Sequence, residues 1–290
     1  LILLVGSFYG GYAQLWAAME EEDSGQYTPW SRLDENDIFH HKVGDASDVV
    51  VAISNQNVFL GSPEANNKRG VVRMYSFGSI ARNPTNSSLL TAEITEEDDN
   101  NLFIGVNEDD RFGSSISTDK FGDFVVIGGA GYARALHRNS TTESWRVVGN
   151  NDIEAPSCSS VATGRVSAGV PCRGCPNDLN ATRIAIASSG KAVIYQFNED
   201  RDDWVQIGDS IVASDDNACN QPLEITQEMK FIRPDALWAH HVSVAMSIDS
   251  MQIAVTCPAS DENRGRVSIY NILPNEGSNP PRSRPTGKGH

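Results

Sequence analysis

The sequence predicts an all-β protein: a β-propeller of four-stranded antiparallel blades. A glycine-led strand recurs four times, with start glycines at 70, 131, 190 and 265 of the 290 residues. An apolar strand precedes each copy, and Gly and Pro (24 and 13 residues) interrupt the chain at short intervals. Short strands at a fixed period with turn residues between them indicate an antiparallel meander, and a repeated meander is typical of propeller blades.

The glycine-led strand alternates apolar and polar residues and usually ends in an aromatic residue. The second copy is the weakest, because Leu136 replaces the tyrosine of the other three. The four copies span residues 70–77, 131–138, 190–197 and 265–272. Alternation with period two is the pattern of a half-buried strand.

Three further strands complete each predicted unit. The apolar strand before the glycine spans residues 58–63, 125–130, 184–188 and 253–258. The strand before that spans residues 50–54, 112–117 and 242–247, and is unclear within 160–166 of the third unit. A tryptophan strand follows two units, at 145–149 and 204–208, and residues 89–94 fill this position in the first unit. Each unit therefore offers four strands.

Phe112-Gly113 followed by the segment from Val126 to Ala130 resembles the FG-GAP repeat of the integrin α-subunit propeller and of many extracellular algal and bacterial proteins. The strand from Val58 to Pro63 is similar to the same motif. The resemblance covers residues 26–272 and depends on repetition, since the motif is loose. His240-His241 stand where the FG pair is expected in the last unit, and the third unit has neither pair.

The resemblance also implies a calcium loop between the first two strands of a blade. In the second unit this loop contains Asp119 and Asp123. Calcium prefers six to eight oxygen ligands with several carboxylates, and two carboxylates are few. The alternatives are a calcium site at Asp119 and Asp123 or a plain hairpin turn.

The expected ring has four blades and is closed by an N-terminal strand. The segment starting at Trp30 has no unit before it, and the fourth unit lacks a tryptophan strand after residue 272. We therefore expect Trp30 to lie beside the strand of residues 266–270, which would bury an open edge. The alternative is a fragment of a larger propeller, since the integrin domain has more than four blades.

Three regions follow from this arrangement: an N-terminal arm (1–25), the propeller (26–272) and a Pro/Arg-rich C-terminal tail (273–290). The apolar arm packs either on its own propeller or on a neighbouring copy, where it could lead to a filament. The segment Leu1–Val5 is either a strand or the remnant of a signal peptide. The sequence leaves each of these pairs open.

Charge and motifs limit the function classes. The net charge of -15 makes nucleic acid an unfavourable partner, and no stretch is long enough for a transmembrane helix. No nucleophile elbow, HExxH motif or P-loop occurs, and Arg134 breaks a dinucleotide pattern in the Gly128–Gly131 segment. His40-His41 and His240-His241 are best interpreted as core histidines, since adjacent strand residues point to opposite faces.

Glycosylation sequons and cysteines indicate the secretory pathway. Sequons occur at Asn86, Asn139 and Asn180. We expect two disulfides among Cys158, Cys172, Cys175 and Cys219, with Cys257 reduced inside a blade. A redox or zinc role for the CxxC pair at 172–175 lacks the βαβ context or the second CxxC that it requires.

These observations predict a secreted or cell-surface glycoprotein, a structural or adhesion-type propeller that binds proteins or copies of itself and is not an enzyme. No cofactor is expected apart from the calcium alternative. The second hypothesis is a secreted propeller enzyme that acts on glycans. A cluster of carboxylates and aromatic residues at one mouth of the propeller would favour the enzyme.

Overall fold

The computed structural model describes the regular part of the chain. The described residues are 2–6, 13–18, 30–32, 49–54, 57–77, 81–82, 90–91, 94–96, 102–139, 142, 144–156, 158–165, 179, 182–188, 190–212, 242–247, 249–257, 265–272 and 283–288. Almost all of them are in strands or turns, and the short helix α1 spans Ala65–Lys68. No helix among these residues has the length and apolarity to cross a membrane.

The N-terminal sheet has three antiparallel strands, β1 (Ile2–Gly6), β2 (Ala13–Ala17) and β3 (Ser31–Arg32). Strand β1 lies against β4, the first strand of the next sheet.

This next sheet has the order β10-β6-β5-β4, and β9 also pairs with β6. Its strands are β4 (Val50–Ile53), β5 (Asn57–Ser62), β6 (Val71–Phe77), β9 (Ile94–Glu96) and β10 (Leu102–Ile104). A separate pair consists of β7 (Ala81–Arg82) and β8 (Leu90–Thr91).

The next two sheets repeat one plan, four strands in chain order plus a short strand that also pairs with the third. The first has β11 (Ser115–Thr118), β12 (Phe124–Gly129), β13 (Gly131–Arg138), β14 (Trp145–Val147) and β15 (Ile153–Ala155). The second has β16 (Cys158–Arg165), β17 (Thr182–Ser188), β18 (Lys191–Asn198), β19 (Asp203–Gln206) and β20 (Ile211–Val212). The last sheet has β21 (Ser243–Met246), β22 (Gln252–Cys257), β23 (Arg266–Ile272) and β24 (Ser283–Lys288).

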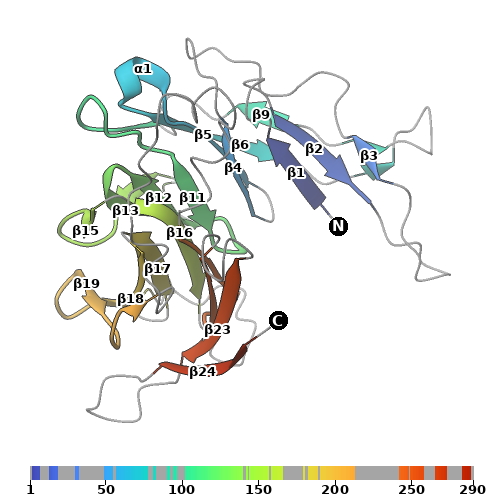
Figure 1. The fold of residues 1–290 in the computed structure, drawn as a ribbon. Coiled ribbons are helices and arrows are strands. Elements are labelled where there is room, and N and C mark those ends of the chain that lie inside the picture. Colours follow the sequence, from blue (N-terminus) through green and yellow to red (C-terminus); the bar gives the residue numbers. More distant parts are fainter. Residues whose placement is uncertain are drawn as a thin grey trace, which may run out of the picture.

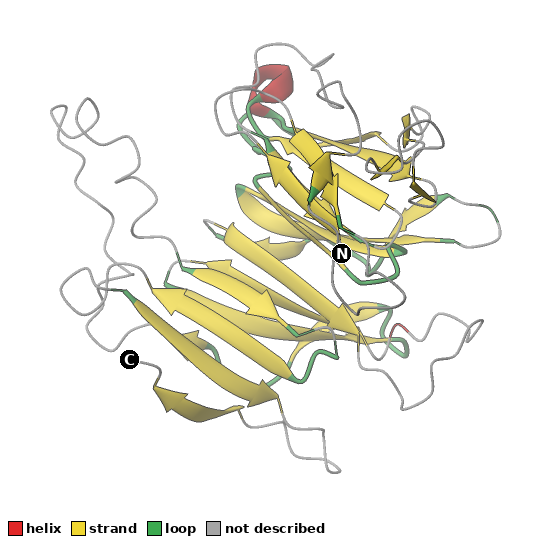
Figure 2. Cartoon of the chain, turned by 90° about the vertical axis from the view of Figure 1, so that its right-hand side faces the viewer, coloured by secondary structure: helices red, strands yellow, loops and turns green. Residues whose placement is uncertain are grey.

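The sheets follow one another in an arc, as Figure 1 and Figure 2 show. The first strand of each sheet contacts the first strand of the next, in the order β1, β4, β11, β16 and β21. Antiparallel sheets stacked face to face around their first strands are propeller blades. The predicted class and the four-stranded blade are therefore confirmed, and the sheets starting at β4, β11, β16 and β21 are called blades A, B, C and D below.

Apolar layers between neighbouring blades form the core. Blades A and B share a layer that includes Phe59, Met74 and Ile127, and blades B and C share one that includes Phe124 and Trp204. A third layer, rich in alanine and small aliphatic residues, lies between blades C and D. Blades A, B and C therefore bury apolar residues on both faces, which explains the near-continuous apolar runs of β5, β12 and β17.

Serine side chains join the innermost strands of neighbouring blades. Ser115 Oγ and Ser117 Oγ on β11 accept hydrogen bonds of 2.9 and 3.0 Å from the main-chain N–H groups of Val161 and Thr163 on β16. Ser160 Oγ on β16 accepts one of 3.2 Å from Val244 N on β21. These bonds satisfy main-chain donors that would otherwise be unpaired near the centre of the arc.

The expected closure by the Trp30 strand is wrong. Trp30 leads into β3, which pairs with β2, while β24 pairs with β23. The free side of β23 is thus already paired, and the sheets do not close into a four-bladed ring. The expected N-terminal arm contains β1 and β2 of a sheet, and the expected C-terminal tail contains β24.

Candidate functional site

The hairpin turn after the first strand of a blade has one design in three blades. Its first residue is Ser54, Asp119 or Ser247, and the side-chain oxygen of this residue accepts a main-chain N–H within the turn. Side-chain capping of this kind explains why serine and aspartate recur at the position. Blade B has a carboxylate at this first position, Asp119, where blades A and D have a serine hydroxyl.

The Asp119 turn is tightly built. Asp119 Oδ1 accepts hydrogen bonds of 2.8 Å from Gly122 N and 3.4 Å from Phe124 N. Gly122 has a φ of +77°, and a Cβ at this position would lie 2.3 Å from Ser54 Oγ of blade A. Glycine is therefore required here for both backbone conformation and space.

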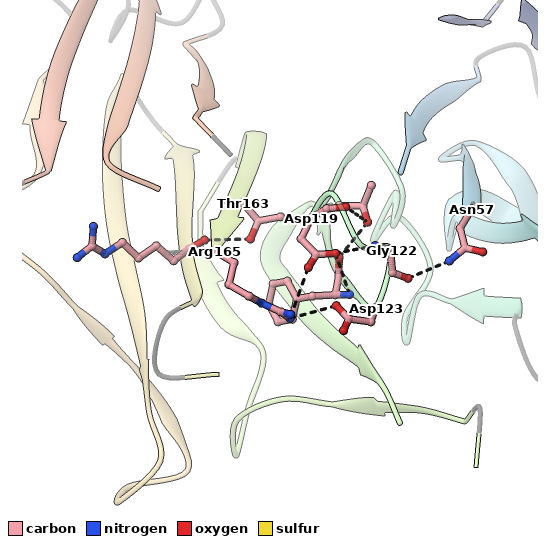
Figure 3. A network of polar contacts seen from close by, with 9 residues as sticks. Asn57, Asp119, Gly122, Asp123, Thr163 and Arg165 are labelled. Carbon is pink, nitrogen blue, oxygen red and sulfur yellow. Dashed lines mark hydrogen bonds and ion pairs between the residues drawn. The ribbon is translucent and has the colours of Figure 1, made fainter. Parts of the chain in front are cut away.

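Three blades contribute to the cluster around this turn (Figure 3). Asn57 of blade A donates a hydrogen bond of 3.0 Å from Nδ2 to Gly122 O. Arg165, at the end of β16 in blade C, places its guanidinium 3.5 Å from Asp119 Oδ2 and 3.1 Å from Asp123 Oδ1. A single cation thus bridges two carboxylates held by the same turn.

Burial gives the two carboxylates different properties. The side chain of Asp119 is 2% exposed and that of Asp123 is 33% exposed. Burial, and next the charge of Asp123, raises the pKa of Asp119 to about 7, although Arg165 acts in the opposite direction. Asp119 therefore exchanges its proton near neutral pH, and Asp123 is the carboxylate that solvent can reach.

His137 lies within the same electrostatic environment. It is a buried residue of β13, and burial lowers its pKa, with Asp123 opposing this shift and Arg165 and Arg146 adding to it. Neither ring nitrogen has a hydrogen-bond partner among the described residues. His137 is therefore neutral at pH 7 and adds no positive charge to the cluster.

An exposed aromatic ring lies beside the Arg165 guanidinium of the cluster. Phe121 is 51% exposed. Its ring lies 4.7 Å from Lys120 Nζ and 5.7 Å from the guanidinium carbon of Arg165. The exposed ring can stack on the apolar face of a ligand while the two cations attract negative charge. We call Asp119, Phe121, Asp123, His137 and Arg165 the turn site.

Calcium does not fit the turn site. Asp119 and Asp123 do share one turn, as the sequence predicts, but Arg165 lies where a cation would bridge them. No group of three or more His, Cys, Asp or Glu suited to a metal ion occurs in the part of the chain that the structure describes.

Two cysteine expectations are wrong. Cys257 on β22 is disulfide-bonded, although we expected a reduced thiol. Cys158 on β16 is a free thiol, although we expected a disulfide. Cys172, Cys175 and Cys219 lie outside the described residues. The sequence around Cys158 predicts an irregular segment stapled by a disulfide. In the structure, Cys158 lies instead in strand β16, which packs near Gly128.

The glycosylation sites stay predictions. Asn139 is exposed at the end of β13, and its Oδ1 accepts a hydrogen bond from Thr142 N. Asn86 and Asn180 lie outside the described residues, as do His40-His41 and His240-His241.

Sequence reasoning missed Phe121, His137 and Arg165 as members of the turn site. The first two lie in segments identified as a turn and a strand, with no motif to mark them. Arg165 ends the strand that was hardest to locate, and its partners lie more than 40 residues away. Only the packing of blade C on blade B brings it to the carboxylates.

Comparisons with known proteins support the fold. No family model and no curated protein matches this chain. A candidate 6-phosphogluconolactonase of Bacteroides uniformis is similar, with a TM-score of 0.51 and 10% identity over 99% of this chain and 68% of that one. Another from Bacteroides fragilis gives a TM-score of 0.55 and 10% identity over 98% of this chain and 66% of that one. The Dos1 propeller gives a TM-score of 0.45 and 9% identity over 99% of this chain and 57% of that one.

This chain thus spans about two thirds of the length of the two Bacteroides structures. At this identity the likeness establishes a shared fold, and FG-GAP membership stays a resemblance. The expectation of a structural or adhesion-type propeller without enzymatic activity is contradicted, because both neighbours are described as candidate enzymes that act on a sugar lactone.

Proposed function

We propose that this chain is a propeller enzyme that hydrolyses a sugar-derived substrate at the turn site. The bridging of Asp119 and Asp123 by Arg165 is the observation that carries the proposal. It places a carboxylate reachable by solvent, a carboxyl with a pKa of about 7 and a fixed cation in one cluster. Perturbed carboxylates next to a charge partner are characteristic of catalytic sites.

Asp123 is the general base in this proposal. Its exposed carboxylate takes a proton from water, whose oxygen attacks the carbonyl carbon of the substrate. The guanidinium of Arg165 stabilises the negative charge that develops on the carbonyl oxygen. The bond to the ring oxygen then breaks, and that oxygen takes up the proton, so that water is added across the ester bond.

Asp119 acts through Arg165 and does not reach the substrate, since its side chain is buried. When Asp119 is protonated, Arg165 interacts mainly with Asp123. When Asp119 ionises, it competes for the same guanidinium. Asp119 is thus a positioning residue that couples the site to pH near 7.

A sugar lactone is the substrate class that we propose, because both structural neighbours are described as candidate lactonases of a phosphorylated sugar acid. The exposed ring of Phe121 offers a platform for the sugar ring, and Lys120 beside it offers a positive charge. This narrows the earlier alternative of an enzyme acting on glycans to a smaller substrate.

We also propose export to an oxidising compartment. The disulfide at Cys257 supports this, because disulfides persist mainly in exported proteins. Glycosylation at Asn139 belongs to the same proposal, since its side chain is exposed at a strand end.

The test measures acid release from glucono-δ-lactone and from its 6-phosphate, with spontaneous hydrolysis subtracted. We expect acceleration by the native chain and a loss of roughly 100-fold or more in kcat/KM for Asp123→Asn. Asp209→Asn, an exposed aspartate of blade C, is the matched control and should keep full activity. Equal rates for the two variants, or no acceleration of either lactone, would overturn the proposal.

A further inference from the structure

The second strand of each blade has one equivalent position near its start. This residue pairs with the residue six places after the start glycine of the glycine-led strand. The four residues at this position are Asn57, Phe124, Arg183 and Gln252. Three of them are uncharged, so the guanidinium of Arg183 is a feature of blade C and not of the repeat.

In blades A and C this position holds the hairpin turn of the next blade. Asn57 Nδ2 donates a hydrogen bond of 3.0 Å to Gly122 O, and Arg183 Nη1 donates one of 2.9 Å to Ser250 O. Gly122 and Ser250 occupy the same place in their turns, since both have a positive φ, +77° and +56°. A neutral amide is therefore sufficient to hold the turn, and this role does not require the charge of Arg183.

The charge of Arg183 is buried and has no counter-ion in the part of the chain that the structure describes. The residue is 5% exposed. Its Nε donates to Gln196 Oε1 at 3.3 Å, and Nη1 also lies 3.8 Å from the sulfur of Met251. Burial lowers the pKa of Arg183, and no neighbouring charge opposes this shift.

The other two arginines of the blade interfaces are paired. Arg134 and Arg165 are both half-buried, and each has a carboxylate within ion-pair distance. Arg183 is buried more deeply and lacks such a partner among the described residues. An unpaired charge in a protein interior is strongly unfavourable, so this guanidinium favours the binding of an anion.

Two hydrogen-bond donors beside each other have no partner among the described residues. Nη2 of Arg183 makes no hydrogen bond to them, while Nε and Nη1 fix the plane of the guanidinium. The hydroxyl of Ser250, a residue with 0% exposure, also has no partner. It lies over Gly164, the cross-strand partner of Arg183, because a Cβ at Gly164 would lie 2.7 Å from Ser250 Oγ. A fixed guanidinium next to an unused hydroxyl is suited to an oxygen anion.

We propose that Arg183 and Ser250 bind a small oxyanion, a phosphate or carboxylate group, between blades C and D. The guanidinium supplies the charge and the N–H donors that both groups accept. The site is separate from the turn site, since Arg165 contacts the turn of blade B and Arg183 contacts the turn of blade D. The proposal therefore does not depend on hydrolysis at the turn site.

Calorimetric titration and thermal unfolding of the whole chain test this with sodium phosphate and with sodium acetate, each compared with sodium chloride at equal ionic strength. A dissociation constant on the order of 1 mM should raise the melting temperature by roughly 5 °C at about 50 mM anion. A larger response to phosphate identifies a phosphate site, and a larger response to acetate identifies a carboxylate site.

Arg183→Gln keeps an amide donor for Ser250 O and removes the charge. It should weaken anion binding by roughly 10-fold or more. Its melting temperature in chloride should not fall, because the variant no longer buries an unpaired charge. Arg183→Lys keeps the charge without the planar fork, so its affinity should lie between those of the native chain and Arg183→Gln.

Arg201→Gln is the matched control. Arg201 is an exposed turn residue of blade C, and the variant removes the same charge from the surface. It should bind the anion like the native chain, and far-UV circular dichroism should show that all variants are folded. If Arg183→Gln does not fold, the comparison of Arg183→Lys with Arg201→Gln decides. No response of the native chain to either anion beyond that to chloride, or equal affinity of the Arg183 and Arg201 variants, would overturn the proposal.

Discussion

The indole Nε1 of Trp204 donates a hydrogen bond of 2.9 Å to the main-chain oxygen of Val148. The bond joins blade C to blade B, and Trp204 also packs on Phe124 of blade B. Trp145 makes the corresponding contact one blade earlier, against Phe59 and Phe103 of blade A. The tryptophan strand of each of these two blades is therefore anchored on the preceding blade.

Trp204→Phe should destabilise the chain more than Trp145→Phe. The first change leaves the Val148 oxygen without its donor, which costs about 1–3 kcal/mol beyond the lost packing. Trp145 Nε1 is also buried but has no hydrogen-bond partner among the described residues. Urea unfolding of both variants gives the comparison, and a larger loss for Trp145→Phe would contradict the assigned role of the bond.

Gly122→Ala should be clearly destabilising. The substitution strains a residue with a φ of +77° and puts a Cβ 2.7 Å from Asn57 Nδ2. We expect a loss of about 3 kcal/mol, from backbone strain and steric overlap together. Gly131→Ala is the matched control, since Gly131 has a φ of +100° but no atom within 4 Å of an added Cβ. It should cost only about 1–2 kcal/mol, and equal losses would exclude a steric role for the turn.

Stability should depend on pH through Asp119. Its folded pKa of about 7 lies above the unfolded value of 3.8. The folded chain therefore keeps a proton that the unfolded chain releases, so stability falls as pH rises from about 4 to about 7. Asp119→Asn removes this proton, and its melting temperature relative to the native chain should rise across that window. Asp209→Asn should show a flat difference, and a flat difference for Asp119→Asn would refute the raised pKa.

Cys158 should react slowly with alkylating agents in the native chain. Burial raises the pKa of this thiol to about 12, so very little thiolate exists at pH 8. The same thiol should react readily after unfolding in denaturant, which serves as the internal control. Mass spectrometry without reductant should find Cys158 alkylated and Cys257 in a disulfide-linked peptide. Rapid native alkylation of Cys158 would show that the strand exposes it.

The repeat could be predicted from the sequence because alternation along a strand is local information. The glycine-led strand predicted at 131–138 is β13, Gly131–Arg138, and the one predicted at 265–272 is β23, Arg266–Ile272. The sequence also places Asp119 and Asp123 correctly in one turn, because two residues four positions apart in a hairpin turn must lie close together. The strand ending at Arg165 was hard to locate because its apolar pattern is interrupted by serine and glycine.

The sequence by itself determined the all-β class, the period of the repeat and the turn that carries Asp119 and Asp123. Only the tertiary structure decided how the terminal strands pair, because no sequence pattern distinguishes β24 from the Trp30 segment as the partner of β23. It also decided the chemistry of the turn. The bridge from Arg165 to Asp123 joins residues 42 positions apart in different blades. Its effect depends on burial, which depends on how one blade packs on the next and not on the spacing of residues along the chain.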